Sequence, residues 1–115
     1  KEKAEDEEAP EIMFKSGGNY TSSSETVSVG DNIIIGIEAE VREEKDPLVK
    51  FNISKKENGG TLEDIYNEDL SDESFEYDYS FEVQSEDAGK TIEYIFTVTN
   101  RDGLTGQKEI ELTIN

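Results

Sequence analysis

Acidic side chains are the most numerous residues in this chain that could do chemistry. Between Thr61 and Asp87 there are eleven acidic residues and no basic one. Asn67, Asp69 and Asp72 lie close enough in sequence to supply part of a Ca²⁺ shell, since Ca²⁺ takes about six to eight oxygen ligands, often several from one loop. The alternative interpretation is a solvated face with turns, which binds no ion. The spacing of an EF-hand is absent, so the acidic run predicts weak Ca²⁺ binding at most.

A second polar group lies at Asn100-Arg101-Asp102-Gly103. Asn and Asp oxygens could bind a cation here. They could equally close a turn, with side chains accepting from the backbone and Gly103 at positive φ. Both interpretations stay open, and the turn predicts that Gly103→Val destabilises the fold whether or not Ca²⁺ is bound.

The residue types needed for most catalytic sites are missing. The chain has no His and no Cys, which excludes a Ser–His or Cys–His nucleophile. Ser22-Ser23-Ser24 has no base nearby in sequence, and carboxylate pairs arise by chance in so acidic a chain. We therefore assign no catalytic, cofactor-binding or metal-binding residue, and we expect a protein that is not an enzyme and has no cofactor.

The net charge restricts the partners. It is −18 at pH 7, so the chain has no basic face with which to displace counterions from nucleic acid. Anionic membrane surfaces are disfavoured for the same reason, which leaves a lipid anchor as the one membrane link we consider. Strong negative charge also resists self-association, so we expect a monomer.

Period-two alternation is the main structural signal. It predicts half-buried antiparallel strands, because successive side chains of a strand point to opposite faces. The inward sets that it predicts in the second half of the chain are Phe75, Tyr77, Tyr79, Phe81 and Val83; Ile92, Tyr94, Phe96 and Val98; and Ile110, Leu112 and Ile114.

The first half of the chain shows shorter elements of the same kind. We expect strands at 11–14, 26–29, 33–41, 49–54 and 61–66, with Asn58-Gly59-Gly60 as a turn and 67–74 as a polar, turn-rich segment. Ile34 breaks the polar face of its strand, which predicts that this face is partly covered. No helical stripe is present. The fold class is therefore all-β, a two-sheet antiparallel sandwich of seven or eight strands.

Two tyrosines are candidates for ligand contact. Tyr20 lies in a glycine- and serine-rich loop, and Tyr66 lies near a predicted edge strand. Exposed aromatic faces would support a module that binds carbohydrate or peptide, whereas burial of both would remove the main support for that function.

Two stretches resemble bacterial immunoglobulin-like domains of the cadherin-like and PKD-like kind. They are ETVSVGDNIIIGIEA, from Glu25 to Ala39, and YIFTVTNRDGLTGQKEIELTI, from Tyr94 to Ile114. The resemblance implies an immunoglobulin-like domain over 11–115 that belongs to a cell-surface or secreted protein. In cadherin-like domains a similar Asp-rich turn can bind Ca²⁺ between modules, so a calcium-rigidified spacer is one alternative.

The first ten residues, KEKAEDEEAP, have no apolar face, and we expect a disordered acidic linker over 1–10. Glu5-Asp6-Glu7-Glu8 resembles the acidic patch that follows the lipidated cysteine of Gram-negative surface lipoproteins. The leading hypothesis is a non-catalytic structural or adhesion-type module outside the cytoplasm, lipid-anchored or secreted. Its expected partners are neighbouring domains or a surface glycan or protein.

Overall fold

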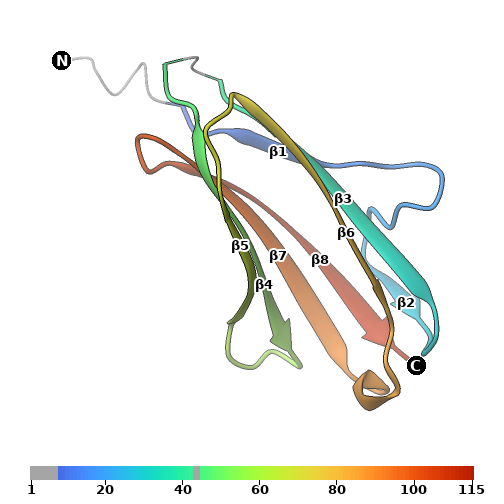
Figure 1. Cartoon of the computed structure of the whole chain (residues 1–115). Helices are drawn as coiled ribbons and strands as arrows, with labels where there is room; N and C mark the ends of the chain where they lie inside the picture. The colour runs from blue at the N-terminus through green and yellow to red at the C-terminus, as the bar shows by residue number, and fades with distance from the viewer. Residues whose placement is uncertain (1–7, 43–44) are drawn as a thin grey trace.

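The computed structural model describes residues 8–42 and 45–115, and it contains eight strands (Figure 1). They are β1 (Glu11–Phe14), β2 (Glu25–Val27), β3 (Asn32–Glu40), β4 (Leu48–Glu57), β5 (Glu63–Asp69), β6 (Ser74–Glu82), β7 (Thr91–Asn100) and β8 (Thr105–Ile114), with one turn of 3₁₀ helix, η2 (Ser85–Asp87), between β6 and β7. Within these residues no helix is long and apolar enough to cross a membrane.

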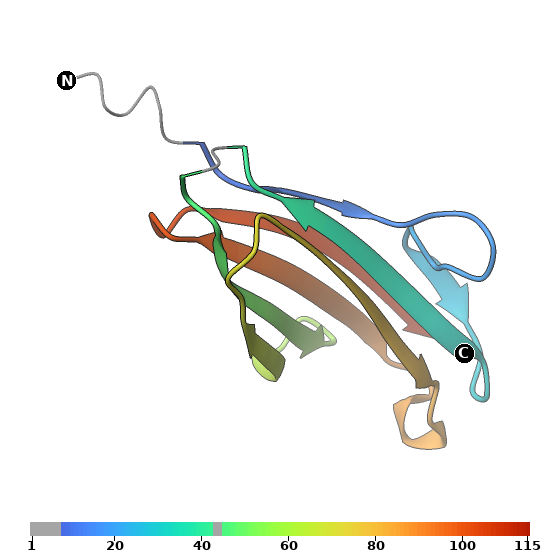
Figure 2. The ribbon, with the colours of Figure 1, turned by 45° about the horizontal axis from the view of Figure 1, so that its top comes forward.

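The strands form two sheets that face each other. One has the order β1-β3-β6 and the other β2-β8-β7-β4-β5. Figures 1 and 2 show β3 and β6 lying over β7 and β8 as two layers. The predicted two-sheet sandwich is confirmed. All pairings are antiparallel except β2 with β8, which is parallel.

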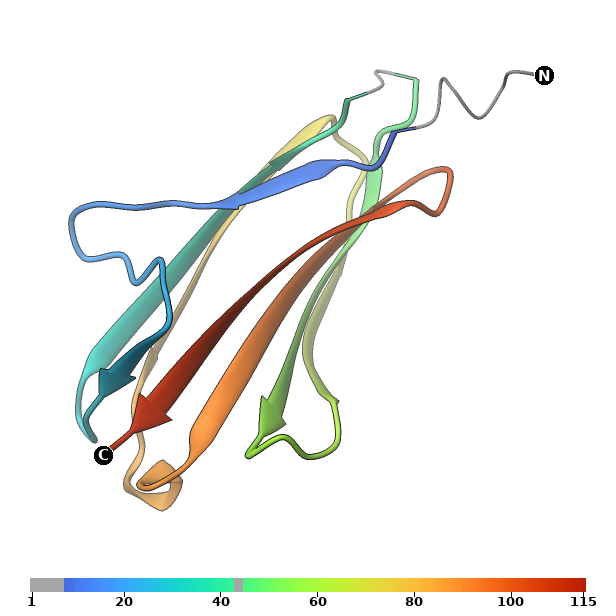
Figure 3. The ribbon, with the colours of Figure 1, turned by 180° about the vertical axis from the view of Figure 1, so that it is seen from behind.

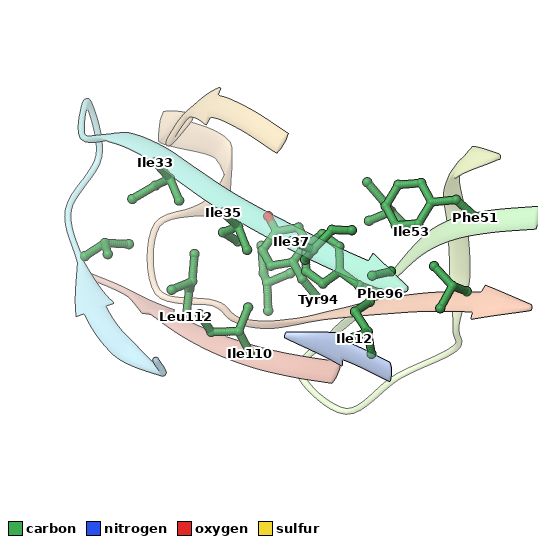
Figure 4. Packing of buried hydrophobic residues seen from close by; sticks show 14 of the residues in the cluster. Ile12, Ile33, Ile35, Ile37, Phe51, Ile53, Tyr94, Phe96, Ile110 and Leu112 are labelled. Carbon is green, nitrogen blue, oxygen red and sulfur yellow. The ribbon is translucent and has the colours of Figure 1, made fainter. Parts of the chain in front are cut away.

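The core lies between the layers, where Figure 4 shows the inward side chains of both sheets meeting. The inward residues of β7 are nearly inaccessible, with Phe96 at 0% and Tyr94 at 5% exposure. Those of β3 and β8 are buried as well; they include Ile33, Ile35, Ile37, Ile110 and Leu112. Each such side chain contributes about 1.5–3 kcal/mol relative to an exposed one.

The aromatic side chains of β6 are less deeply buried than the alternating pattern suggested. Phe75, Tyr77, Tyr79 and Phe81 face inward and pack against the core, but each is only half-buried. The reason is their place in the sheet, because β6 is an edge strand and no strand of the same sheet lies on its free side.

The predicted polar segment 67–74 is corrected by the structure. Asn67, Glu68 and Asp69 extend β5 at the edge of the larger sheet, and Ser74 begins β6. The extension forms because β5 pairs with β4 through Lys50↔Asp69, after a register shift between Ile53 and Ser54. Ser54, which ends the strand predicted at 49–54, is 2% exposed.

The two ends of the described chain lie at opposite ends of the sandwich. Glu8 to Pro10 lie beside the β7–β8 turn, where Asn100 Nδ2 donates to the carbonyl of Glu8 at 3.3 Å. Asn115 lies at the far end, and all three ribbon views agree on this placement (Figures 1, 2 and 3). Figure 3 shows the segment from β1 to β2 passing from one sheet to the other. The acidic patch predicted at 5–8 falls outside the described residues except for Glu8.

Candidate functional site

The outer face of the smaller sheet has a glycine at its centre. Gly36 lies in the middle of β3, opposite Asp78 of β6. The segment after β1 follows this face, because Lys15 N–H donates to the Gly36 carbonyl and Thr21 N–H donates to the Ile34 carbonyl, at 2.9 and 2.8 Å. The covering predicted from Ile34 is therefore present, and Lys15 and Tyr20 lie over the strand.

Gly36 makes room for these two side chains. A Cβ atom at this position would lie 2.6 Å from the Tyr20 ring, 2.8 Å from Asp78 Oδ1 and 2.8 Å from Lys15 Cδ. These are distances that real Cβ atoms do not show, so a larger residue would displace the side chains. A glycine inside a strand often marks such a close approach.

Polar contacts join the same residues into one cluster. Tyr20 OH donates to Asp78 Oδ2 at 3.1 Å, and Lys15 Nζ contacts Asp78 Oδ1 at 3.0 Å and Glu76 Oε1 at 3.1 Å. The Lys15 ammonium also lies 5.7 Å from the Tyr20 ring centroid. The hydrogen bonds that Lys15 donates to Asp78 and Glu76 raise the pKa of Lys15 above its ordinary value. We call Lys15, Tyr20, Gly36, Glu76 and Asp78 the glycine-centred cluster.

Two shallow hollows flank this cluster. One, of about 230 Å³, is lined by Asn19, Tyr20, Ile34 and Asp78. The other, of about 170 Å³, lies beside Met13, Glu38 and Phe75. Ligand pockets for drug-sized molecules usually measure roughly 300–1,000 Å³. The first hollow is therefore smaller than a typical ligand pocket, and a tyrosine, an amide and a carboxylate are among the groups that line it.

The predicted Ca²⁺ ligands do not come together in one shell. Asn67 and Asp69 lie on strand β5, and the Asn67 side chain accepts from Asn52 Nδ2 at 3.0 Å. Asp72 lies in the following turn, where its carbonyl accepts from Leu48 N–H. Over residues 8–42 and 45–115 no group of three or more carboxylates is placed to hold a metal ion.

The Asn100 turn matches the structural interpretation. Gly103 has a φ of 86°, as predicted. Asn100 is 2% exposed, and its Oδ1 accepts from Leu104 N–H at 3.0 Å. Since its Nδ2 donates to Glu8, the whole amide of Asn100 is used to hold the turn and the incoming chain together.

Tyr66, the second predicted contact residue, is half-buried like Tyr20. Its ring stacks on Tyr77 of β6 at 5.0 Å between centroids, and its hydroxyl donates to Glu68 at 2.6 Å. That hydrogen bond, together with loss of solvent, raises the pKa of Tyr66 to about 12. The structure thus separates the two tyrosines, one on the outer face of the smaller sheet and one between the edges of the two sheets.

Sequence reasoning missed two features of the molecule. It did not assign Lys15 and Asp78 to one cluster, although Gly36 within an otherwise regular alternation was a usable signal. It also missed Asp46, which is 3% exposed, contacts Arg101 Nη2 at 3.5 Å, and has no hydrogen-bond partner for Oδ2 among the described residues. Nothing in the local pattern distinguishes this acid from its exposed neighbours.

Comparisons with known proteins give the fold and no family. No family model matches the chain, and no curated protein matches it in sequence. The superoxide reductase (neelaredoxin) from Ignicoccus hospitalis is similar in structure, with 8% identity, a TM-score of 0.55, and coverage of 94% of this chain and 81% of that one. A variant of that enzyme gives 6% identity and the same TM-score, over 93% of this chain and 80% of its own.

A sporulation control protein is also similar in structure. Spo0M from Bacillus subtilis has 5% identity and a TM-score of 0.53 over 94% of this chain, which spans half of that protein. Identities this low show a shared β-sandwich fold and leave the activity of this chain open.

These findings overturn two expectations drawn from the sequence. We expected no enzyme and no cofactor, but an enzyme has this fold over most of its length. One-electron chemistry of the kind that a superoxide reductase performs depends on a bound redox cofactor. Both expectations are therefore wrong as drawn, because the sandwich is compatible with catalysis. The chain does lack His and Cys, the imidazole and thiolate ligands that suit redox metals.

Proposed function

We propose that this chain is a structural, adhesion-type module of a bacterial cell-surface or secreted protein. The observation that carries the proposal is the placement of the described ends at opposite ends of the sandwich (Figure 1). A module built this way adds its length between whatever is attached to its two ends. The immunoglobulin-like resemblance over 25–39 and 94–114 supports the same function, and a lipid anchor before the acidic patch would place it at a membrane surface.

The strand arrangement suits a module that carries tension. The last strand, β8, pairs with β7 over nine consecutive positions. On its other side, the C-terminal end of β8 pairs in parallel with β2, up to Val27↔Ile114. The link is extended by Asn115 N–H, which donates to the Val27 carbonyl, and by Glu111 N–H, which donates to Ser24 Oγ, both at 2.9 Å. A pull on the two chain ends loads these bonds together along the strands.

A single-molecule pulling experiment tests this proposal. Because the chain has no Cys, attachment points can be placed by pairs of substitutions. In the Ala9→Cys, Asn115→Cys variant the force acts between opposite ends of the sandwich. In the Glu86→Cys, Asn115→Cys variant both attachment points lie at one end, so the force separates β7 from β8 one hydrogen bond at a time. We expect a clearly higher unfolding force in the first geometry, since forced unfolding is governed by the unfolding barrier. Equal forces in the two geometries would count against a tension-bearing module.

The hollow beside Tyr20 favours a second candidate function, carbohydrate binding. A tyrosine ring offers a face for a sugar, and Asp78 and Asn19 offer hydrogen-bond partners for its hydroxyls. A glycan array probed with the wild-type chain and with Tyr20→Ala tests it, with Tyr66→Ala as the matched control. Glycan signals that are lost in Tyr20→Ala and kept in Tyr66→Ala support carbohydrate binding. No glycan signal with the wild-type chain, or an unchanged signal with Tyr20→Ala, contradicts it. The calcium-rigidified alternative is not carried forward, because no group of three or more carboxylates in the described residues is placed to hold a metal ion, and the Asn100 amide is used to hold its own turn.

A further inference from the structure

The four edge strands of the sandwich differ in how they are protected. The edge strands β1 and β2 have four and three residues, too short to present a long ladder. The edge strand β5 is interrupted by its register shift near Ile53 and Ser54. Short strands and bulges of this kind keep edges from pairing with another chain.

The fourth edge, β6, has neither protection. Its nine residues pair with β3 without a register shift, from Asn32↔Glu82 to Glu40↔Ser74, and it contains no proline. An edge strand of this kind presents, on its free side, backbone N–H and C=O groups at every second residue. Of these groups, the Glu82 carbonyl accepts from Gln84 Nε2 at 2.9 Å. The described chain therefore has one long, regular edge.

The side chains of β6 give this edge a definite chemistry. Its inner face has the four half-buried aromatic residues from Phe75 to Phe81, which still expose part of their rings. Its outer face has the exposed acids Glu76, Asp78 and Glu82. A second copy of this chain would bring the same acids opposite these, and like charges placed directly opposite destabilise a strand pair.

We propose that β6 accepts an extended basic segment of another protein as an added strand, whose Lys or Arg residues alternate with apolar ones. The backbone of the segment would supply the missing ladder, as in other cases of strand addition. Its apolar side chains would cover the half-buried aromatic rings, and its basic side chains would meet the acids of the outer face.

The cluster around Gly36 shows that a cation suits this outer face. Lys15 reaches over β3 and contacts Glu76 and Asp78 at 3.1 and 3.0 Å. A partner strand would bring cations from the opposite side of β6. Among the acids of this strand, Glu82 lies farthest along the strand from Lys15, so it should contribute most to the binding of a basic segment.

The test uses synthetic peptides of known sequence with the whole chain. The probe has about seven residues in which Lys and Val alternate, a length typical of strands. One control peptide has the same composition in blocks. A second control peptide has N-methyl groups at alternate amides along one edge of the extended peptide. A third control peptide has the N-methyl groups along the other edge. Methylation keeps every charge, but it prevents pairing through the edge that faces β6.

Charge-reversal variants locate the binding surface. We compare Glu82→Lys on β6 with Glu111→Lys on β8, because both residues are exposed and both substitutions change the net charge equally. Binding of the alternating peptide should fall by about tenfold or more in Glu82→Lys and by about twofold at most in Glu111→Lys, as expected for a local charge contact. Backbone amide signals of β6 should shift on binding, while those of β8 stay in place.

The outcomes separate strand addition from general attraction to an acidic protein. Loss of binding with only one of the two methylated peptides, together with selective loss in Glu82→Lys, supports the proposal. Equal binding of the block and methylated peptides, or equal losses in the two variants, overturns it. No measurable binding of the alternating peptide at low ionic strength also overturns it.

Discussion

Strands β6 and β7 have the same alternating sequence pattern, but their inward side chains are buried to different depths. The inward residues of β7 are buried almost completely, with Ile92, Phe96 and Val98 at 0% exposure. The inward residues of β6 are aromatic, yet each is only half-buried. The difference follows from position, because β7 lies between β4 and β8 whereas β6 has a neighbour on one side only.

The face that a strand buries and the depth of its burial are two separate properties, although one alternating pattern predicts both. Alternation decides which face of a strand meets the core. The number of neighbouring strands decides how deeply that face is buried. In this molecule β7 therefore contributes mainly to stability, and β6 keeps apolar surface and backbone groups available at the edge.

Truncation of one aromatic residue on each strand should give the largest contrast. Phe96→Ala removes a fully buried ring that packs against Phe14 and Tyr79, and we expect it to lower the free energy of unfolding by about 3–5 kcal/mol. Phe81→Ala should cost roughly half as much, because its ring is already partly hydrated. Urea-induced unfolding measures both, and Phe96→Leu replaces Phe96→Ala if that variant does not fold. Equal losses would show that β6 is as buried as β7.

The turn that joins β7 to β8 should give the next largest effect. Gly103 has a φ of 86°, and a side chain in this left-handed region costs about 1–2 kcal/mol. Gly103→Val should therefore lower the melting temperature by several degrees, and Gly103→Asn should recover part of the loss, because Asn tolerates this conformation. An unchanged melting temperature for Gly103→Val would contradict the turn.

Tyrosine titration distinguishes Tyr66, which lies between the edges of the two sheets, from Tyr94, which lies in the core. The pKa of Tyr66 is raised to about 12, first by its hydrogen bond to Glu68, whereas the pKa of Tyr94 is raised by burial. Glu68→Gln should lower the pKa of Tyr66 toward its ordinary value and leave that of Tyr94 where it was. NMR of chains with ¹³C-labelled tyrosine rings follows each hydroxyl separately. A parallel change at Tyr94, or none at Tyr66, would refute the assignment.

A carboxylate pair on the outer face of β7 and β8 should give the smallest effect. The pKa of Glu109 is raised, first by its hydrogen bond with Glu93 and then by repulsion from that charge. A raised carboxyl pKa means that the charged form is disfavoured in the folded state. This penalty is present at neutral pH and is lost as the pH falls through the raised pKa.

Glu109→Gln should therefore raise the melting temperature slightly at pH 7 and leave it unchanged under acidic conditions. The gain is small because Glu109 is exposed, so salt screens its repulsion from Glu93. Glu25→Gln, an exposed acid on β2, serves as the control for the change in net charge. A gain of the same size in the control, or one that persists in acid, would exclude the pair as its cause.

Local patterns predicted the faces of the strands, and long-range pairing determined the rest. The inward sets of β7 and β8, the Asn58 turn and the Gly103 turn could be predicted from sequence, because alternation and positive φ are local properties. The extension of β5 through Asn67 to Asp69 could not, since it depends on pairing with β4. For the same reason the half-burial of β6 was not predicted, because no local signal marks an edge.

The candidate site was less accessible to sequence reasoning than the fold. Tyr20 was identified, but Lys15 and Asp78 are 63 positions apart and are brought together by β3 lying between them. The predicted cation ligands Asn67, Asp69 and Asp72 were grouped by sequence proximity. In the structure Asn67 and Asp69 lie on strand β5, and Asp72 lies in the turn that follows it.

The central claim is that β6 has a free edge, whereas β7 is paired with a strand on each side. Native-state amide hydrogen exchange on the uncomplexed chain tests this claim most directly. We expect slow exchange for the amides of β7, which has neighbours on both sides. Along β6, every second amide between Ser74 and Glu82 should exchange fast, because it points away from β3. Uniform protection along β6 would mean that something covers this edge and would contradict the account.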